Sequence, residues 1–454
     1  MAVWSFPSLQ GVRSTRRADS EFFRPEYLLA ENRIRACSFI ELGRIGNFVS
    51  GPFGSAFHVQ NYDFRSPYRY IRGRDVKPFF LLNDDNRYLP ASHFYRLQQY
   101  EVRNNDLMIS VVGTLGNVAI CTEEEVPAMF SCKSTLFRSN EADPYFLLAY
   151  LNSAPGQLCL LRRQRGAIQG GLNIEDLRTI PVPRFGQESE QAIADKVRVA
   201  HRSLIISSQK YEAAQQLLES ELVLDKLTYP NPVGYVAQFS ELGAAHRADA
   251  EYFHVRYEAF LSAVRNYSRG CQPVNKLTKQ ILPNFDRRKA SGEVSYIEIG
   301  DVSVSNGSYS ETKVAAKDLP ANAKIELSGG EIIISQVRPT RGAIAIVDDK
   351  LSHKAVCSGA FYVCTSNEVS HREIIWVYLR CMKSVFEKFC GGTSYPTIDS
   401  RYIGRFPVPL FDDGLASRIK TLVVQAKNTQ LESVRLLDQA KTRVEQLIEA
   451  AIKR

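Results

Sequence analysis

Several features that define familiar classes of protein are missing from this sequence of 454 residues. No apolar run reaches the roughly 18 residues that a membrane-spanning helix needs. The start of the chain lacks a basic segment followed by an apolar stretch, so no secretory signal is expected. Nine scattered cysteines include no C-x-x-C pair, which argues against a disulfide framework and a structural zinc site. We therefore expect buried thiols in a cytoplasmic protein that has no membrane partner.

Motifs for catalysis are missing too. The chain has no G-x-x-x-x-G-K-[ST] phosphate loop, no G-x-G-x-x-G after a strand, and no H-E-x-x-H among its seven histidines. Asp143-Pro144-Tyr145-Phe146 is superficially similar to the D-P-P-Y motif of amino-methyltransferases, but it lacks the second proline and opens an apolar helix. We therefore expect a binding component rather than an enzyme, with no cofactor or metal of its own.

The composition is that of a globular protein with more than one domain. Hydrophobic residues make up 44% and charged residues 23%, and the chain is too long for one ordinary domain. The net charge of +8 permits a nucleic-acid partner without requiring one.

One phrase near the start of the chain occurs a second time. The segment 17–27 reads RADSEFFRPEY and the segment 247–257 reads RADAEYFHVRY, an offset of 230 residues. Arg, Ala, Asp, Glu, an aromatic residue, Phe and Tyr keep their places. This agreement indicates two halves that share an ancestor or a packing role.

The ends of the two halves also match. Each half closes with a Pro-Val-Pro phrase, at Pro181–Pro183 and Pro407–Pro409, and a long amphipathic segment follows from Gln187 and from Asp413. Apolar residues recur at spacings of four and seven, which is typical of a coiled-coil seam. We expect two long helices that pair antiparallel and hold two globular units apart. The predicted seam consists of Ile193, Val197, Leu204, Tyr211, Leu218 and Leu222 with Leu415, Ile419, Leu422, Ala426, Leu436, Ala440, Val444 and Leu447.

The predicted fold class is α/β, in the mixed α+β sense. The two globular domains are predicted to form a pseudo-twofold tandem repeat. We place the first globular domain at 1–186, with an irregular leader over 1–16, and the central helix at 187–229. The second globular domain is predicted at 230–411 and the final helix at 412–454, and the composition of 227–239 is that of a linker at the start of the second domain.

Strand–turn–strand segments occupy matching places in the two halves. Residues 105–120 read NDLMISVVGTLGNVAI and residues 330–346 read GEIIISQVRPTRGAIAI. The apolar runs match and the turns differ, as expected of one scaffold that carries two different recognition tips. Segment 67–78 alternates in the manner of a strand and interleaves arginines with tyrosines, which suits phosphate contact and stacking; a solvated strand face is the alternative. The glycine-rich loop 49–64 fits either a simple turn or close approach to a polyanion.

Together these motifs resemble the specificity subunit of type I restriction–modification enzymes. The resemblance extends from Arg17 to the end and depends on SGPFGS at Ser50, DLMISVVGTLGNVAI at Asp106, GGLNIEDLRTIPVP at Gly170 and the two matching segments of the second half, although the second half has no SGPFGS. It implies two target recognition domains, each reading one half of a bipartite double-stranded DNA site. It also implies two methyltransferase partner subunits that hold S-adenosylmethionine and methylate adenine at N6, and nuclease and motor subunits when restriction occurs.

The candidate DNA contacts are polar and basic residues of the predicted loops. In the first half they are Arg69, Arg72, Arg74, Thr114, Asn117, Arg162, Arg163, Arg165 and Gln169. In the second half they are Arg287, Arg288, Lys289, Gln336, Arg338, Thr340, Arg341, Thr393, Ser394 and Tyr395. Three alternatives stay open: a stand-alone two-headed DNA-binding protein such as a repressor, an enzyme with an unrecognised site, and a coiled-coil adaptor.

Overall fold

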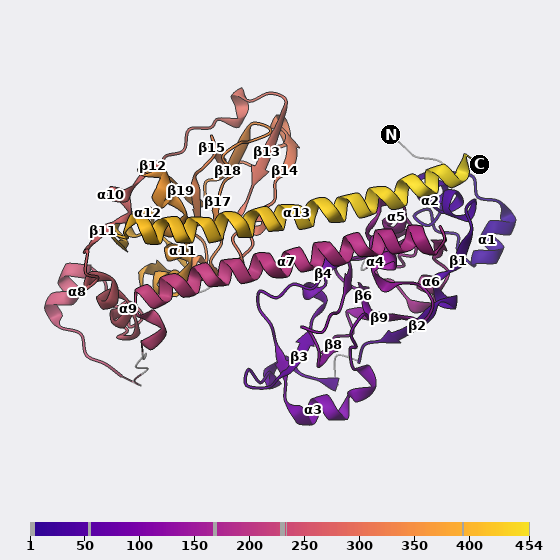
Figure 1. Ribbon diagram of the computed structural model, residues 1–454, viewed down its shortest axis with the longest axis horizontal. Coiled ribbons are helices and arrows are strands. Elements are labelled where there is room, and N and C mark those ends of the chain that lie inside the picture. The colour runs from indigo at the N-terminus through magenta and orange to yellow at the C-terminus, as the bar shows by residue number, and fades with distance from the viewer. Residues whose placement is uncertain are drawn as a thin grey trace. The chain divides into compact units, whose positions relative to one another are not determined.

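The computed structural model describes residues 5–52, 56–166, 170–227, 232, 234–392 and 395–453. Its contacts divide the chain into two compact units (Figure 1). Unit 1 consists of Met1–Leu204 and Gln430–Arg454, and unit 2 consists of Ile205–Thr429. Each long helix therefore contributes one half to each unit. The fold is mixed α+β, as the sequence predicts.

Unit 1 contains a five-stranded sheet of order β2-β9-β6-β7-β4 and a three-stranded sheet of order β5-β3-β8. The strands β3 and β8 run parallel, whereas β6 lies antiparallel to both β7 and β9. The strands are β1 (Phe39–Glu41), β2 (Gly46–Ser50), β3 (Tyr68–Ile71), β4 (Phe79–Phe80), β5 (Tyr88–Leu89), β6 (Leu107–Ser110), β7 (Val118–Ile120), β8 (Ala128–Phe130), β9 (Ser134–Ser139) and β10 (Pro181–Pro183).

The helix α4 of unit 1 packs against its main sheet. The helix α4 carries six consecutive buried residues from Phe146 to Leu151, which pack in one core with β6 and β7. Asp143 accepts the backbone N–H of Tyr145 and caps α4, and Ser153 caps α5 in the same way. The helices are α1 (Leu9–Thr15), α2 (Pro25–Arg35), α3 (Ala91–Arg96), α4 (Pro144–Asn152), α5 (Ala154–Arg162) and α6 (Ile174–Arg178).

Unit 2 repeats this plan with a four-stranded sheet of order β12-β19-β16-β17 and a second one of order β14-β13-β18-β15. Its strands are β11 (Cys271–Pro273), β12 (Thr278–Ile281), β13 (Glu293–Ile297), β14 (Thr312–Ala315), β15 (Ala323–Leu327), β16 (Ile332–Ser335), β17 (Ile344–Ile346), β18 (Ala355–Ser358), β19 (Phe361–Ser366), β20 (Cys390–Gly391), β21 (Thr397–Ile398) and β22 (Pro407–Pro409). Its helices are α8 (Phe239–Ala245), α9 (Arg256–Arg265), α10 (Val274–Leu277), α11 (Arg372–Cys381) and α12 (Ser400–Arg405).

The repeated phrases make the same contacts in both units. Val182 of the first Pro-Val-Pro pairs with Ile40, and Val408 of the second pairs with Gln272. Arg17 donates through Nε and Nη2 to Asp19, and a second Nη2 bond, 2.6 Å long, reaches the carbonyl of Gln164.

In unit 2, Arg247 donates in the same way to Asp249, and its Nη2 lies 2.8 Å from the carbonyl of Cys390. Each guanidinium also lies over an aromatic ring, that of Phe22 in unit 1 and that of Tyr252 in unit 2. The recurring phrase therefore has one packing role in both halves.

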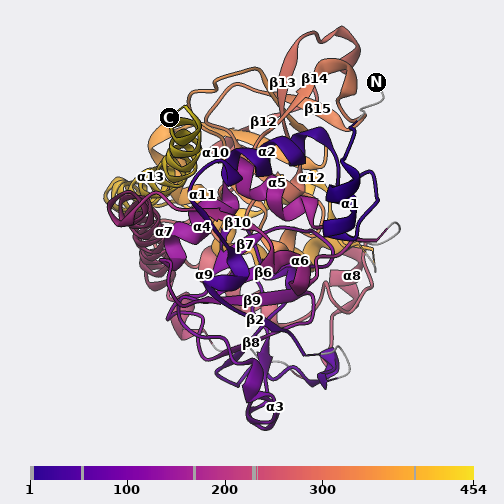
Figure 2. The same cartoon turned by 90° about the vertical axis from the view of Figure 1, so that its right-hand side faces the viewer.

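The two long helices are α7 (Gln187–Glu221) and α13 (Asp413–Ile452), which at 1.5 Å per residue are about 50 and 60 Å long. In unit 1, Ala200 meets Ser433, and Lys196 meets Gln439, so the helices run antiparallel as predicted. They lie side by side in both ribbon views (Figures 1 and 2). Of the predicted seam, Leu204, Leu422 and Leu447 are half-buried and the other residues are buried.

Small residues that the apolar pattern does not reveal bring the two helices together. The hydroxyl of Ser433 donates to the carbonyl of Ala200 over 2.7 Å in unit 1, and that of Ser207 donates to the carbonyl of Ala426 over 2.7 Å in unit 2. The two serines are 226 residues apart, and so are the two alanines. Each unit thus has a serine of one long helix bonded to an alanine carbonyl of the other, with the roles of α7 and α13 exchanged. Such a bond requires the two helix backbones to lie close together.

Some local predictions are wrong. The described part of the leader is not irregular, because Ser8 caps the helix α1. The strand predicted over 67–78 ends at Ile71, since a 3₁₀ turn follows at Gly73–Asp75. The central helix ends at Glu221, and Val223 has a left-handed φ of 56°. The nine cysteines are free, but Cys132 is exposed.

Candidate nucleic-acid interface

Each unit brings together two loops that are far apart in sequence. In unit 1, Val112, just after β6, bridges to Gly171, which closes a second glycine-rich stretch of the sequence at 166–171. In unit 2, Val337, just after β16, bridges to Thr397. The first members of the two pairs are 225 residues apart and the second members 226, so the same junction is built twice. Some of the polar candidates of each half lie close to this junction in sequence, among them Thr114 and Arg165 in unit 1 and Arg338 and Tyr395 in unit 2.

The junction in unit 2 presents a stacked arginine. Arg338 adopts a left-handed φ of 48°, and its backbone N–H donates to the carbonyl of Pro396 over 2.7 Å. Its guanidinium lies 4.4 Å from the ring centre of Tyr395, a side chain that is 66% exposed. A guanidinium held over an aromatic ring is pre-organised for contact with a base or a phosphate.

The neighbouring candidates in unit 2 surround that arginine. Arg341 is exposed, Thr340 is half-buried, and the Gln336 side chain donates to the carbonyl of Ile398 over 3.4 Å. Thr393 and Ser394 lie outside the described residues, as does Gln169 in unit 1. This junction therefore places several side-chain hydrogen-bond donors, those of Arg338, Thr340 and Arg341, close together in one turn.

The junction in unit 1 carries shorter side chains. Thr114 is exposed, whereas the Asn117 amide donates to the carbonyl of Val76 over 3.0 Å and so holds the turn in place. Arg165 is about half exposed and forms an ion pair with Asp176. The two units thus differ in what they present, as the difference in their turns predicts.

Two arginines of the first half do not belong to this surface. Arg162 and Arg163 are 8% and 3% exposed, and both contact the buried carboxylate of Glu31. Burial alone raises the pKa of Glu31, but the charges of Arg163 and Arg162 outweigh it and lower that pKa to about 2. The prediction that these arginines contact DNA is wrong, because they form an internal ion cluster.

A similar correction applies to the arginines around β3. Arg69 is 5% exposed and donates to the carbonyl of Leu82 over 2.9 Å, so it lies inside the unit. Arg72 is held by Asp75 and Asp85, whereas Arg74 keeps 59% of its side chain exposed. The alternation of basic and aromatic residues over 67–78 does not indicate which side chains face the interior of the unit. Of the three, only Arg74 is freely accessible.

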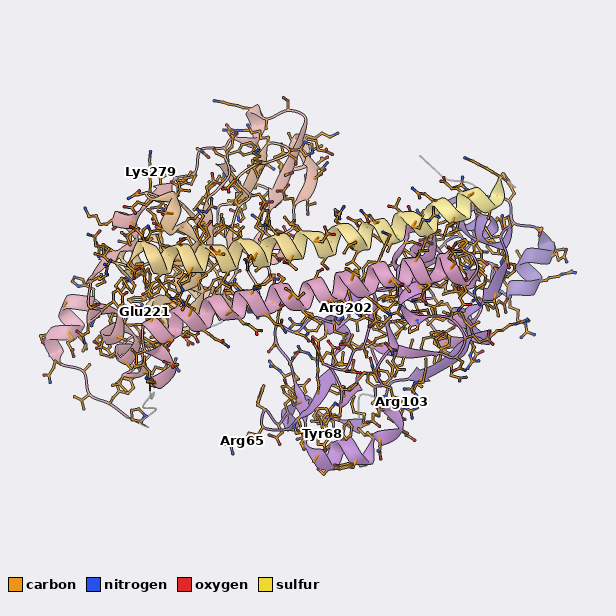
Figure 3. All side chains as sticks on the ribbon, in the orientation of Figure 1. Arg65, Tyr68, Arg103, Arg202, Glu221 and Lys279 are labelled. Atoms are coloured by element: carbon orange, nitrogen blue, oxygen red, sulfur yellow. The ribbon has the colours of Figure 1, made fainter. Side chains whose placement is uncertain are left out.

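The outer part of unit 1 has an aromatic surface that the sequence pattern did not single out. Arg65 and Tyr68 lie at the end of the unit away from α7 (Figure 3). Phe64 and Tyr95 are 67% and 61% exposed, and an open cavity of about 710 Å³ is lined by Phe64, Arg65 and His93 among others. In the nearby glycine-rich loop, Gly51 packs against the backbone of Ser131, and residues 53–55 lie outside the described residues.

The basic loop of unit 2 is at the surface. Arg287, Arg288 and Lys289 are all exposed. Arg287 donates to the carbonyl of Leu319 over 2.8 Å, and Arg288 forms an ion pair with Asp286 while 85% of its side chain stays exposed. This loop can supply cations to a phosphate backbone.

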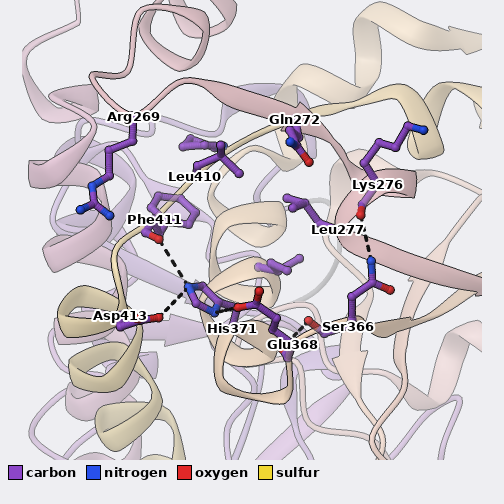
Figure 4. A pocket seen from close by; sticks show the side chains of 13 residues that line it. Arg269, Gln272, Lys276, Leu277, Ser366, Glu368, His371, Leu410, Phe411 and Asp413 are labelled. Carbon is purple, nitrogen blue, oxygen red and sulfur yellow. Dashed lines mark hydrogen bonds and ion pairs between the residues drawn. The ribbon is translucent and has the colours of Figure 1, made fainter.

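A separate cavity of about 510 Å³ in unit 2 contains a histidine between two acids (Figure 4). His371 lies 2.9 Å from Glu368 and 3.6 Å from Asp413. The nearby Ser366 hydroxyl donates to the carbonyl of Glu368, whereas the Ser370 hydroxyl lies 3.3 Å from Nδ1 of His371. Nε2 of the same ring lies 3.4 Å from the carbonyl oxygen of Phe411, so both ring nitrogens have partners within the protein.

The described part of the chain offers no cluster of metal ligands and no membrane-spanning helix. No group of three or more His, Cys, Asp or Glu is placed to hold a metal ion there. None of the helices described is long and apolar enough to cross a membrane.

Comparison with known proteins gives structural matches only, since no family model and no curated protein matches the chain. The crystal structure of a type I restriction-modification S subunit from M. genitalium is 13% identical, with a TM-score of 0.42 over 91% of this chain and 95% of that chain. The HsdS subunit from Thermoanaerobacter tengcongensis is 11% identical, with a TM-score of 0.27 over 91% and 96%. A structure on complex assembly and conformational transition of the type I R-M system is 11% identical, with a TM-score of 0.28 over 91% and 97%. Because these scores are low, the function has to be argued from the chain's own geometry.

Proposed function

We propose that this chain is the DNA sequence-specificity subunit of a type I restriction–modification system. One observation carries the proposal: the same two-loop junction is built twice on one scaffold, and its polar tips differ. Two equal scaffolds with different tips suit a bipartite target whose halves differ in sequence. A single catalytic site would not require such a repeat.

The chemistry of the tips supports base reading. Arginine, glutamine, asparagine and threonine can bond to base edges in the major groove, and exposed lysine and arginine contact phosphates. Arg338 and Arg341 in unit 2 and Thr114 and Arg165 in unit 1 are accessible for such contacts. Affinity then falls steeply with salt, whereas selectivity depends on the few groups that reach bases.

The long helices and the partners complete the proposal. The paired α7 and α13 set the gap between the half-sites, and their outward faces dock two methyltransferase subunits. S-adenosylmethionine binds in those partners, which methylate adenine at N6 after flipping the base from the duplex. Nuclease and motor subunits join the complex for restriction.

Methylome sequencing of a strain with and without this chain tests the proposal. We expect N6-methyladenine to disappear from one bipartite motif when the chain is deleted and to return on complementation. An unchanged set of methylated motifs would overturn the proposal. Tight binding of a split site by the chain alone, with no change in methylation, would favour the stand-alone repressor instead.

The role of the helices has its own test. Seven residues, about two turns, are inserted after Leu204 in α7 and after Thr429 in α13, so that the antiparallel pair stays in register. At 1.5 Å per residue the pair lengthens by about 10 Å, which corresponds to about three base pairs of duplex. We expect a longer gap between unchanged half-sites. A change in the bases read, with the gap constant, would refute this role.

A further inference from the structure

Arg380, at the end of α11, is a buried cation whose hydrogen bonds join three segments of unit 2. It is 3% exposed. Its Nε donates to the Tyr211 hydroxyl of α7, and its Nη1 donates to the carbonyls of Gly342 and Ile344, over 3.0 and 3.1 Å. Its Nη2 donates to the carbonyls of Val304 and Ser305, over 3.2 and 2.7 Å. A guanidinium has five N–H donors, so each of them has an acceptor.

None of these five acceptors is a carboxylate. The charge of Arg380 is met instead by the rings of Tyr211 and Trp376, whose centres lie 5.1 and 5.3 Å from the guanidinium carbon. Burying a cation without an anion is costly, and an apolar side chain would fill the space at lower cost. The arrangement therefore indicates a role that needs five directed bonds rather than packing alone.

Unit 1 holds the matching turn with neutral amides. The carbonyl of Gly116 accepts from Gln157 over 2.9 Å, and that of Val118 accepts from Asn152 over 3.0 Å. Gly116 and Gly342 are 226 residues apart, and so are Val118 and Ile344. Arg380 therefore bonds to the same two carbonyls as that pair of amides, and in addition to α7 and to the loop at Val304.

The held segment carries three of the candidate contacts of unit 2, which are Arg338, Thr340 and Arg341. The 3₁₀ turn Pro339–Arg341 lies between Arg338 and Gly342, which both have a positive φ. The backbone N–H of Arg338 is bonded to Pro396 at one end, and Arg380 holds the carbonyl of Gly342 at the other. The neighbouring loop has no spare room, because a Cβ at Gly307 would lie 2.6 Å from the Ile344 carbonyl and 2.7 Å from Arg380 Nη1.

The contact to α7 is a neutral one. Burial raises the pKa of Tyr211 to about 12, although the charge of Arg380 acts in the opposite direction. The hydroxyl stays protonated at neutral pH, so it meets the guanidinium as a hydrogen-bond acceptor without neutralising its charge.

We propose that Arg380 is a positioning residue that fixes the loop 336–342 against α7 and so determines which bases unit 2 selects. The inference rests on the proposed function. Arg380 itself touches no DNA, because it lies beneath the turn.

The test uses the complex of the full chain with its methyltransferase partner and a library of duplexes randomised in both half-sites. Variants Arg380→Lys and Tyr211→Phe are compared with the wild type. An ammonium has three donors and cannot serve five acceptors, so we expect Arg380→Lys to reduce discrimination about tenfold in the half-site read by unit 2. Discrimination in the other half-site and affinity for non-specific duplex should stay within about twofold. Tyr211→Phe should act in the same direction with a smaller effect.

Gln157→Ala supplies the matched control, since it loosens the equivalent turn in unit 1 and should relax the other half-site only. Unchanged selection by both Arg380→Lys and Tyr211→Phe would overturn the inference, and so would equal loss in both half-sites, which indicates general destabilisation. If Arg380→Lys fails to fold, Tyr211→Phe decides, because it removes one hydroxyl. Absence of any selected sequence with the wild type would instead refute the proposed function.

Discussion

The two units build one core position from opposite chemistry. In unit 1, the buried carboxylate of Glu31 on α2 contacts Arg162 and Arg163. In unit 2, the residue 230 positions later is Leu261 on α9, which is 2% exposed. Phe389 stands 226 positions after Arg163 and packs against the rings of Tyr402 and Phe406. An ion cluster in unit 1 and an apolar cluster in unit 2 thus occupy equivalent positions of the repeat.

The difference explains why the predicted DNA contacts at Arg162 and Arg163 are wrong. Arginines before a glycine-rich loop look like a surface ready for phosphate, yet Arg162 lies over the ring of Phe22, as Lys388 lies over that of Tyr252 in unit 2. Their charge is matched inside the unit. What the units share is their backbone contacts, and what they present to a partner lies at the loop tips.

The largest expected effect comes from removing the carboxylate. Glu31→Leu leaves Arg162 and Arg163 buried without an anion, so we expect unit 1 to lose about 3–5 kcal/mol of unfolding free energy. Urea unfolding with hydrogen exchange resolved by unit measures the loss. The triple variant Glu31→Leu, Arg162→Lys, Arg163→Phe introduces the residues of unit 2 and should recover most of it. A triple variant as unstable as the single one would break the comparison.

The second largest expected effect is a difference between the two units in stability at acid pH. Because the folded pKa of Glu31 is lowered to about 2, its ionisation stabilises unit 1 above its ordinary pKa of 4.5, and that stability is lost as pH falls through the window between them. The loss of unfolding free energy is about 3 kcal/mol. Unit 2 has no such loss at the equivalent position, because Leu261 cannot ionise. Asp19 and Asp249, whose pKa values are both lowered mainly by hydrogen bonds from their arginines, affect the two units alike.

Hydrogen exchange between pH 5 and pH 2 should therefore show unit 1 opening first. Glu31→Gln cannot ionise and should remove the difference in pH dependence between the units. Simultaneous opening of both units in the wild type would contradict the assignment.

A smaller effect is expected at the tip of unit 2. Arg338→Ala removes the guanidinium stacked on Tyr395 and keeps a side chain at the same positive φ, so the backbone cost is little changed. We expect weaker binding of the cognate duplex by about 1–3 kcal/mol, measured by titration at fixed salt. Duplexes already altered in that half-site should show no further loss. Arg435→Ala, which removes an exposed cation from α13, is the control.

The smallest expected effect concerns a feature that the two units share, which is the serine hydrogen bond between α7 and α13. Ser207→Ala and Ser433→Ala each delete one hydrogen bond between α7 and α13, so each should lower the unfolding free energy by about 0.5–1.5 kcal/mol. Urea unfolding of the two variants should give equal losses, one in each unit. Clearly unequal losses would show that the two equivalent hydrogen bonds do not contribute equally to the unfolding free energy of their units.

Much of the fold follows from local pattern. The strand–turn–strand segments became β6–β7 and β16–β17, the apolar helix after Asp143 became α4, and the long helices pair antiparallel. These features depend on periodicity and on repeated letters, which a single sequence displays. The leader helix α1 escaped notice because a short helix capped by one serine has little periodicity.

The candidate site followed from the sequence only in part. The pattern placed Arg338 and Tyr395 in separate loops, and the structure stacks them. It gave no sign that Arg380 reaches five acceptors or that Arg69 faces inward, because those depend on residues far away in the chain.

By itself, the sequence determined the repeat, the order of elements and the long helices, since spacing and propensity act within short segments. Tertiary structure alone decided which cations are free. A guanidinium looks the same in a sequence whether it meets Glu31, a ring or solvent, and its accessibility depends on what the fold brings beside it.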